Sequence, residues 1–156
     1  MGTMQIVEYR PNLAAAFKAL NEAWITQYFA LEAKDHEVLD DPQSAIIDRG
    51  GRILFLVEAD EVVGCCALLA MADGGFEVAK MAVAEPHKGR GHGRALMAAC
   101  IERARACGAP RLYLETNSAL GPALALYRGF GFRELDGMER SASDYARVDV
   151  WMELRL

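Results

Sequence analysis

Glycine alternates with basic side chains in one short stretch of the chain. Residues 88–94 read KGRGHGR, with glycine at positions 89, 91 and 93. Because glycine adopts backbone conformations closed to other residues, alternating glycines can turn successive N–H groups toward one anion. A helix is predicted directly after this loop, over residues 92–107, and its unbonded N–H groups and macrodipole also attract negative charge. The spacing therefore predicts a phosphate cradle, for which pyrophosphate is the natural ligand.

Two well-known phosphate-binding patterns do not fit this loop. The pattern G-x-x-x-x-G-K-S/T needs Lys and then Ser or Thr after its last glycine, whereas Arg94 and Ala95 follow Gly93. The pattern G-x-G-x-x-G fails because the three glycines are spaced by two and two. The loop does fit Q/R-x-x-G-x-G/A, with Lys88 where Gln or Arg is usual. The alternative is an ordinary glycine-rich turn with solvated basic side chains.

The elements around the loop follow from the apolar pattern and the turn residues. Strands are predicted at 4–9, 52–58, 62–70, 76–84, 111–116, 132–136 and 145–156. Helices are predicted over 12–39, as one long helix or two with a bend, over 92–107 and over 122–130. The helix over 92–107 connects two strands, which are therefore expected to run parallel. The predicted fold class is α/β (α+β mixed), a mixed central sheet flanked by helices, in a single domain over 1–156.

Composition narrows the class of protein. The 156 residues carry a formal net charge of −5, which disfavours nucleic acid as a partner. No apolar run is long enough to cross a bilayer and no signal-like segment stands at the start, so a cytoplasmic protein without a membrane partner is expected. The four cysteines form no Cys-x-x-Cys pair and have no His at metal-ligand spacing, so no metal is expected and the cysteines are predicted to be small buried residues.

The loop and the element order together make the chain similar to the GNAT superfamily of N-acetyltransferases. The stretch AKMAVAEPHKGRGHGRALM, residues 79–97, resembles the acetyl-CoA-binding motif of that family. The stretch NSALGPALALYRGFGF, residues 117–132, resembles its second motif. The N-terminal helical region is similar to that of bacterial members, some of them fused to MarR-type regulators. The resemblance covers nearly the whole chain and implies a GNAT-like fold with acetyl-CoA as the acetyl donor.

The resemblance also implies which residues hold acetyl-CoA. Backbone groups of Met81, Ala82 and Val83 would contact the pantetheine arm, and a backbone N–H near them would stabilise the oxyanion. Asn117 and Tyr127 would line the thioester end. The pyrophosphate would be held by Lys88, Gly89, Arg90, Gly91, His92, Gly93 and Arg94.

Acetyl transfer to an amine needs a base. An ammonium with a pKa near ~10.4 costs roughly 4–5 kcal/mol to deprotonate at neutral pH. Glu77 is the candidate, because it lies on the strand leading into the loop, where several family members carry a catalytic Glu. In an alternating strand Glu77 shares a face with Ala79, Met81 and Val83, and such apolar neighbours would raise its pKa. The alternative is a solvent-facing Glu at the start of the strand.

The leaving CoA thiolate needs a proton. By the resemblance, Tyr127 occupies the position of the family's general acid. A positioned phenol can donate in a tight hydrogen bond although its pKa of ~10 exceeds the ~8.5 of a thiol. The alternative is an aromatic residue packed on the core beside Leu124. Direct attack of the amine on acetyl-CoA is expected, because Cys65, Cys66 and Cys100 lack a neighbouring arrangement that would activate a thiolate.

The acceptor is the least defined part of the predicted site. Trp24, Tyr28 and Phe29 belong to the region that covers the acceptor pocket in the resembled family, although an aromatic stripe at helical spacing also fits a core. Four acids could attract a cationic amine or could belong to a solvated helix face: Glu22, Glu32, Asp35 and Glu37.

The expected function is transfer of the acetyl group of acetyl-CoA to a primary amine of a small molecule, an amino acid or a protein. A non-catalytic acyl-CoA-binding sensor on the same fold would keep the loop without needing Glu77 or Tyr127. An unrelated nucleotide-binding domain is disfavoured by both failed patterns and by the lack of an acidic ribose partner after a first βα turn. Homodimers are common in the resembled family, so a homodimer is compatible with this interpretation.

Overall fold

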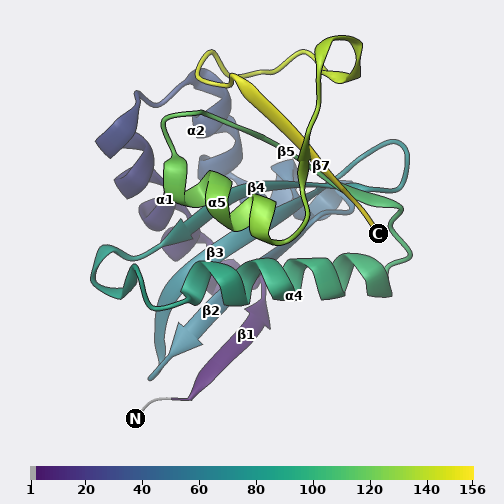
Figure 1. Ribbon diagram of the computed structural model, residues 1–156. Helices are drawn as coiled ribbons and strands as arrows, with labels where there is room; N and C mark the ends of the chain where they lie inside the picture. Colours follow the sequence, from purple (N-terminus) through teal and green to yellow (C-terminus); the bar gives the residue numbers. More distant parts are fainter. Residues whose placement is uncertain (1–2) are drawn as a thin grey trace.

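The computed structural model describes residues 3–156, which form a seven-stranded mixed sheet with helices on both faces (Figure 1). The strands are β1 (Met4–Glu8), β2 (Arg52–Glu58), β3 (Glu61–Ala70), β4 (Phe76–Val83), β5 (Arg111–Thr116), β6 (Arg133–Glu134) and β7 (Val150–Arg155). The α-helices are α1 (Ala14–Tyr28), α2 (Ala33–Asp40), α3 (Pro42–Ala45), α4 (His92–Ala106) and α5 (Gly121–Gly129). The strand order is β1-β2-β3-β4-β5-β7-β6, and the predicted fold class is confirmed.

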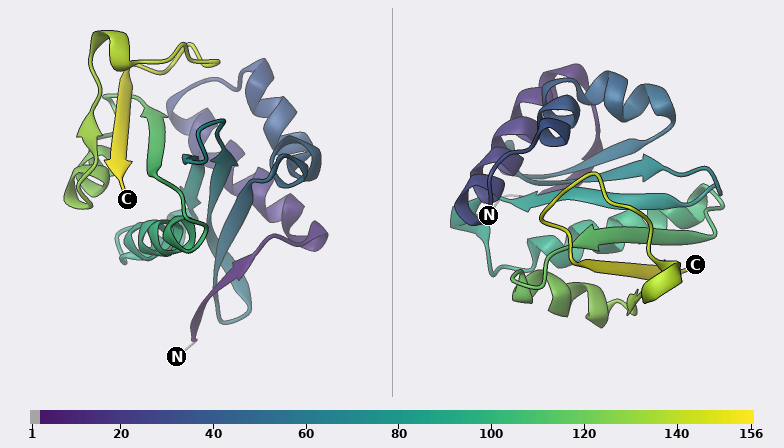
Figure 2. Two further views of the ribbon diagram at one scale, coloured as in Figure 1. Left: turned by 90° about the vertical axis from the view of Figure 1, so that its right-hand side faces the viewer. Right: turned by 90° about the horizontal axis from the view of Figure 1, so that it is seen from above.

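The sheet is covered by α1 and α2 on one face and by α4 and α5 on the other (Figure 2). In β2, Ile53 and Phe55 pack on the α1 side, while Leu54 and Leu56 pack on the α4 side. Burial on both faces explains why β2 is an uninterrupted apolar run rather than an alternating one. In the described part of the chain, no helix has the length and apolar character needed to span a membrane.

The parallel pairing of β4 with β5 is short. It covers Phe76 with Leu112 and Glu77 with Tyr113, at the start of both strands. Beyond these two pairs the strands are no longer bonded to each other, so the sheet opens toward their carboxyl ends. The predicted parallel pair is confirmed, and the opening creates room for a ligand between the two strands.

A β-bulge interrupts β4 just before the loop. Cys65 pairs with Ala82 and Ala67 with Ala79, so β4 holds one more residue than β3 in this interval. Lys80 lies within the bulge and has a left-handed φ of 54°. The extra residue reverses the alternation of faces along the strand.

The reversal corrects the expected surroundings of Glu77. Before the bulge Val78 packs on the α4 side, and after it Met81 and Val83 pack on that same side. Glu77 therefore lies on the opposite face from Met81 and Val83, not on their face as a strictly alternating strand predicts. Its face is the one where Lys80 reaches α2 and Ala82 packs toward α1.

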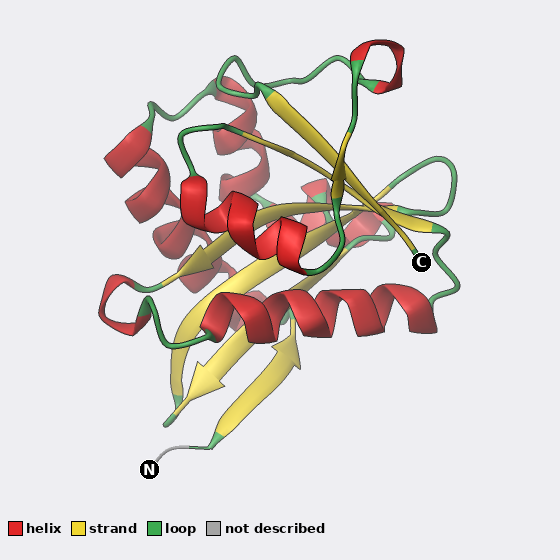
Figure 3. Ribbon diagram, in the orientation of Figure 1, coloured by secondary structure: helices red, strands yellow, loops and turns green. Residues whose placement is uncertain are grey.

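Other boundaries differ from the sequence prediction for local reasons. The helical region 12–39 is two α-helices, separated by an extended Phe29. The last two strands are shorter than predicted, and residues 140–149 form a loop without helix or strand (Figure 3). Side-chain bonds tether this loop: Asp149 accepts from the Ser118 backbone N–H at 2.7 Å. Cys107 is exposed after the end of α4, which corrects its predicted burial, whereas the other three cysteines are buried as predicted.

Candidate active site

A pocket of about 420 Å³ lies between β4 and β5. Its walls come from these strands, the glycine loop, the start of α4, α5, the end of α1 and the loop before β7. The predicted site residues that line it are Glu77, Met81, Ala82, Val83, Lys88, Gly89, Gly91, His92, Gly93, Asn117 and Tyr127. The structure thus brings most of the predicted residues to one cavity.

The glycine loop has the backbone conformation that its sequence predicts. Gly89 and Gly91 have left-handed φ values of 78° and 81°, which other residues adopt at a cost. Gly91 is the residue before the first turn of α4, and the first helical bond runs from the Ala95 N–H to the Gly91 carbonyl. The N–H groups that precede Ala95 therefore lie outside the helical ladder and are free to bind an anion.

Two of the predicted phosphate-binding residues do not line the pocket. Arg90 donates to Glu58 at 3.3 Å and to the His87 ring at 3.1 Å. The Arg94 guanidinium lies 5.5 Å from the centre of the Phe130 ring. Both arginines belong to the 88–94 stretch, but their guanidinium groups contact protein groups and do not line the cavity.

Glu58, at the end of β2, anchors the loop and was missed by sequence analysis. Its carboxylate accepts a hydrogen bond from His92 Nε2 at 2.8 Å, and His92 is only 3% exposed. The hydrogen bond from His92 lowers the pKa of Glu58 below its ordinary value. An acid at the end of an apolar strand gives no signal of a partner 34 residues away.

The same region holds a group of metal-ligand residue types. Ligand atoms of Glu58, His87 and His92 lie within 4.8 Å of one another. His and carboxylate oxygen are ordinary ligands of zinc. In this arrangement the Arg90 guanidinium already bonds both Glu58 and His87, which competes with a cation.

Glu77 lines the pocket with a strongly shifted pKa. Burial, and next the nearby Glu115 carboxylate, raise the pKa of Glu77 to about 7. A carboxyl with such a pKa exchanges a proton near neutral pH, as a general base must. These surroundings support the predicted base over a solvent-facing glutamate at the strand's start.

Tyr127 belongs to the pocket and to the core together. Its ring packs against Phe132 at a centroid distance of 5.9 Å, and burial raises the pKa of its phenol. It also lines the pocket, so its packing fixes the ring at the wall of the cavity. The packing on Phe132 fits the predicted core aromatic, and the place in the pocket wall is compatible with the predicted proton donor.

Asn117 holds the loop before β7 in place. Its amide nitrogen donates to the Arg147 carbonyl at 2.6 Å, and its side-chain oxygen accepts from the Ala119 N–H at 2.8 Å. Both ends of the side chain are therefore engaged by backbone. Asn117 lines the pocket while it ties residue 147 to the end of β5.

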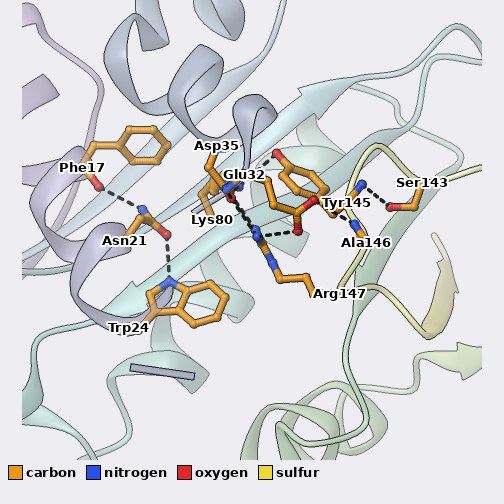
Figure 4. A network of polar contacts seen from close by, with 10 residues as sticks. All are labelled: Phe17, Asn21, Trp24, Glu32, Asp35, Lys80, Ser143, Tyr145, Ala146 and Arg147. Carbon is orange, nitrogen blue, oxygen red and sulfur yellow. Dashed lines mark hydrogen bonds and ion pairs between the residues drawn. The ribbon is translucent and has the colours of Figure 1, made fainter. Parts of the chain in front are cut away.

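A buried ionic cluster lies beside the pocket (Figure 4). Asp35 is fully buried and accepts from Lys80 Nζ at 2.6 Å and from both terminal nitrogens of Arg147 at 2.7 Å. Arg147 also pairs with Glu32 at 3.3 Å, and Lys80 donates to the Tyr145 hydroxyl at 3.0 Å. Burial alone raises the pKa of Asp35, but the hydrogen bonds from Arg147 and Lys80 outweigh it and hold this pKa well below its usual range.

The cluster changes the role of two acids that the sequence singled out. Glu32 and Asp35 are neither part of a solvated helix face nor available to a cationic ligand, because both form ion pairs within the cluster, Glu32 with Arg147 and Asp35 with Lys80 and Arg147. Sequence analysis missed both cations. One signal of the cluster was available in the sequence: Lys80 stands in the middle of the apolar strand at residues 76–83, and a buried charge needs a partner of opposite charge.

Comparisons with known proteins agree with this architecture. Residues 15–132 match the acetyltransferase (GNAT) family. An "IAA acetyltransferase" of Azospirillum brasilense is 37% identical over 84 residues, which are 53% of this chain and 55% of that protein. The chain spans 55% and 59% of the lengths of the first two curated relatives that it matches.

Solved structures share the fold over nearly the whole chain. A GNAT-family acetyltransferase from Staphylococcus aureus Mu50 has a TM-score of 0.85 at 16% identity, covering 98% of this chain and 99% of that one. The protein yncA from Salmonella typhimurium, solved with its cofactor acetyl-CoA, has a TM-score of 0.76 at 21% identity, covering 98% and 94%.

Proposed function

The chain belongs to the acetyltransferase (GNAT) family, and from this premise we propose that it transfers the acetyl group of acetyl-CoA directly to a primary amine. One observation carries the proposal. A single pocket joins the glycine loop at the start of α4 to Glu77, the carboxyl whose pKa is raised to about 7. An anion cradle and a base suited to neutral pH thus share one cavity.

The loop residues fit the pyrophosphate of acetyl-CoA. A Cβ added at Gly89 or Gly91 would meet no atom within 4 Å, so the space beside the loop backbone is open. The N–H groups before Ala95 supply donors for phosphate oxygens. Lys88 also lines the pocket, with its ammonium paired to Glu85 at 2.9 Å. The yncA structure with acetyl-CoA supports the same ligand here.

Two pocket residues, Glu77 on β4 and Tyr127 on α5, divide the proton transfers. When bound, acetyl-CoA supplies the acetyl group and a thiolate leaving group. Glu77 accepts the first proton that the acceptor's ammonium loses, and the Tyr127 hydroxyl donates a proton to the thiolate as the new C–N bond forms and the C–S bond breaks. The second proton that the nitrogen loses restores the Tyr127 hydroxyl. Beyond Glu77, β4 is no longer paired with β5, so backbone N–H groups on this edge of β4 are available to donate to the oxyanion.

Thiol release from acetyl-CoA tests the proposal. We expect free thiol to appear only when acetyl-CoA and a primary amine are both present, with stoichiometric acetylated amine. Calorimetry with acetyl-CoA, CoA and ATP checks the donor separately. Tight ATP binding with no binding of CoA would refute the proposal. Acetyl-CoA binding without turnover of any amine would favour an acyl-CoA sensor.

A further inference from the structure

The charged residues that line the acceptor end of the pocket are not equally available. They are Glu77, Lys80, Glu115 and Arg147. Lys80 and Arg147 both bond Asp35, and Arg147 also bonds Glu32. Because Asp35 is completely buried, withdrawing either cation would break charge-assisted hydrogen bonds that no water can replace. Neither cation is therefore free to bind a ligand carboxylate.

Two carboxylates, Glu77 and Glu115, line this acceptor end of the pocket, which we call the acceptor chamber, and of the two Glu115 has neutral hydrogen-bond partners. Glu115 accepts from the Tyr113 hydroxyl and from Ser143 Oγ, each at 2.7 Å. Glu77 takes part in no ion pair within residues 3–156, and Glu115 is the neighbouring charge that most disfavours its ionised form. After the cations are matched with Glu32 and Asp35, the chamber retains the negative charge of this pair. An ammonium group would be attracted to it.

An aromatic wall faces the same chamber. Trp24, Tyr28 and Phe29 line the pocket, and the Trp24 and Phe29 rings meet edge to face at 6.5 Å. The Trp24 indole N–H donates to Asn21 at 3.0 Å, and Asn21 in turn donates to the Phe17 carbonyl at 3.0 Å. Figure 4 shows this chain of bonds holding the indole beside the ionic cluster. A rigid aromatic surface suits a flat apolar body.

We propose that the acceptor is an arylalkyl amine without a carboxylate, its ammonium near Glu77 and Glu115 and its ring against Trp24 and Phe29. This inference rests on the proposed acetyl transfer and names its substrate class. An α-amino acid would bring its carboxylate beside Glu77 and Glu115, where the two lining cations, Lys80 and Arg147, are already bonded to Asp35. A lysine side chain would bring the ammonium but no ring for the wall.

Matched acceptors test the proposal directly. Tryptamine and tryptophan differ by one carboxylate, as do 2-phenylethylamine and phenylalanine, while Nα-acetyllysine and propylamine supply an amine without a ring. We expect kcat/KM for tryptamine to exceed that for tryptophan by at least about tenfold, since like charges brought together at a site are strongly unfavourable. Equal or better use of tryptophan, or a preference for Nα-acetyllysine, would overturn the inference.

A binding measurement separates this inference from the proposed reaction. Calorimetry on protein saturated with CoA compares tryptamine and tryptophan without any chemistry. Tryptamine binding with no turnover would refute acetyl transfer and still support the chamber's preference. Failure of tryptamine to bind, or equal binding of both ligands, would refute the preference whatever the turnover.

Variants connect the preference to the named residues. Glu115→Gln should raise KM for tryptamine at least about threefold with a smaller change in kcat, because an ammonium loses charge attraction. Glu102→Gln removes the same charge from the exposed face of α4 and is the matched control. Trp24→Ala should weaken tryptamine more than propylamine. An equal effect of Trp24→Ala on both amines would contradict the role of the aromatic wall.

Discussion

At the scale of single residues, the pKa of Glu77 sets the pH at which the proposed base is ready. Its pKa is raised to about 7 by burial and by Glu115, so the carboxylate form that accepts a proton dominates only above pH 7. We expect kcat/KM for the amine to fall about tenfold per pH unit below 7, because kcat/KM reports the pKa of the free protein. Glu77→Gln should lower kcat by about 10²–10⁴ and abolish that limb. A glutamine variant that keeps the limb would show that another group titrates.

Tyr127 makes a separate prediction, because its role concerns the leaving thiolate. Tyr127→Phe keeps the ring that packs on Phe132 and removes only the hydroxyl. We expect kcat to fall by about 10²-fold while the Kd for acetyl-CoA changes little. Tyr9→Phe removes a phenol that does not line this pocket and serves as the control. Wild-type turnover in Tyr127→Phe would remove the residue from the proton transfer.

At the scale of elements, local patterns predict much of the fold, whereas long-range pairings escape them. The glycine loop, the helix after it and the parallel strands are visible because they depend on neighbours in sequence. The bulge at Lys80 cannot be predicted from the sequence, because the side chains of VAKMAV, residues 78–83, fit the pattern of a regular strand. It depends on the register with β3, and it moved Glu77 to the other face from Met81.

Side-chain clusters are hidden for a related reason. Asp35 meets Lys80 and Arg147 across 45 and 112 residues, so no spacing rule connects them. The expected roles of the loop residues and Tyr127 rest on the resemblance of two motifs, at the expected separation, to those of the family. The contact between Glu58 and His92, and the balance of charges in the acceptor chamber, are visible only in the three-dimensional structure.

The junction of loop and helix supports a prediction about one element. Gly91→Glu would place a carboxylate beside the N–H groups at the start of α4 and should weaken acetyl-CoA binding by more than about tenfold. Gly108→Glu is a close control, because Gly108 follows the same helix, has a similar φ of 73° and also has open space around it. Calorimetry that finds equal losses for both variants would assign the effect to backbone strain, and unchanged affinity for Gly91→Glu would refute the cradle.

At the scale of the whole molecule, the Asp35 cluster joins α2, β4 and the loop before β7 into one buried network. Asp35→Asn removes the charge that balances Lys80 and Arg147, and we expect a loss of about 3–5 kcal/mol in the free energy of unfolding, as for other buried ion pairs that lose one partner. Urea denaturation measures this loss. Asp40 lies on the same helix, α2, as Asp35, and it forms an exposed ion pair with Lys18 of α1. Asp40→Asn should therefore cost much less.

The same cluster fixes a direction for the dependence of stability on pH. The pKa of Asp35 is lower in the folded protein than in the unfolded chain, so its contribution is fully present above the unfolded value of ~3.9 and is lost as pH falls through the folded value. The stability difference between wild type and Asp35→Asn should therefore be constant near neutral pH and shrink in strong acid. A difference that stays constant down to the acid transition, or equal losses for Asp35→Asn and Asp40→Asn, would show that the carboxylate charge does not hold these elements together.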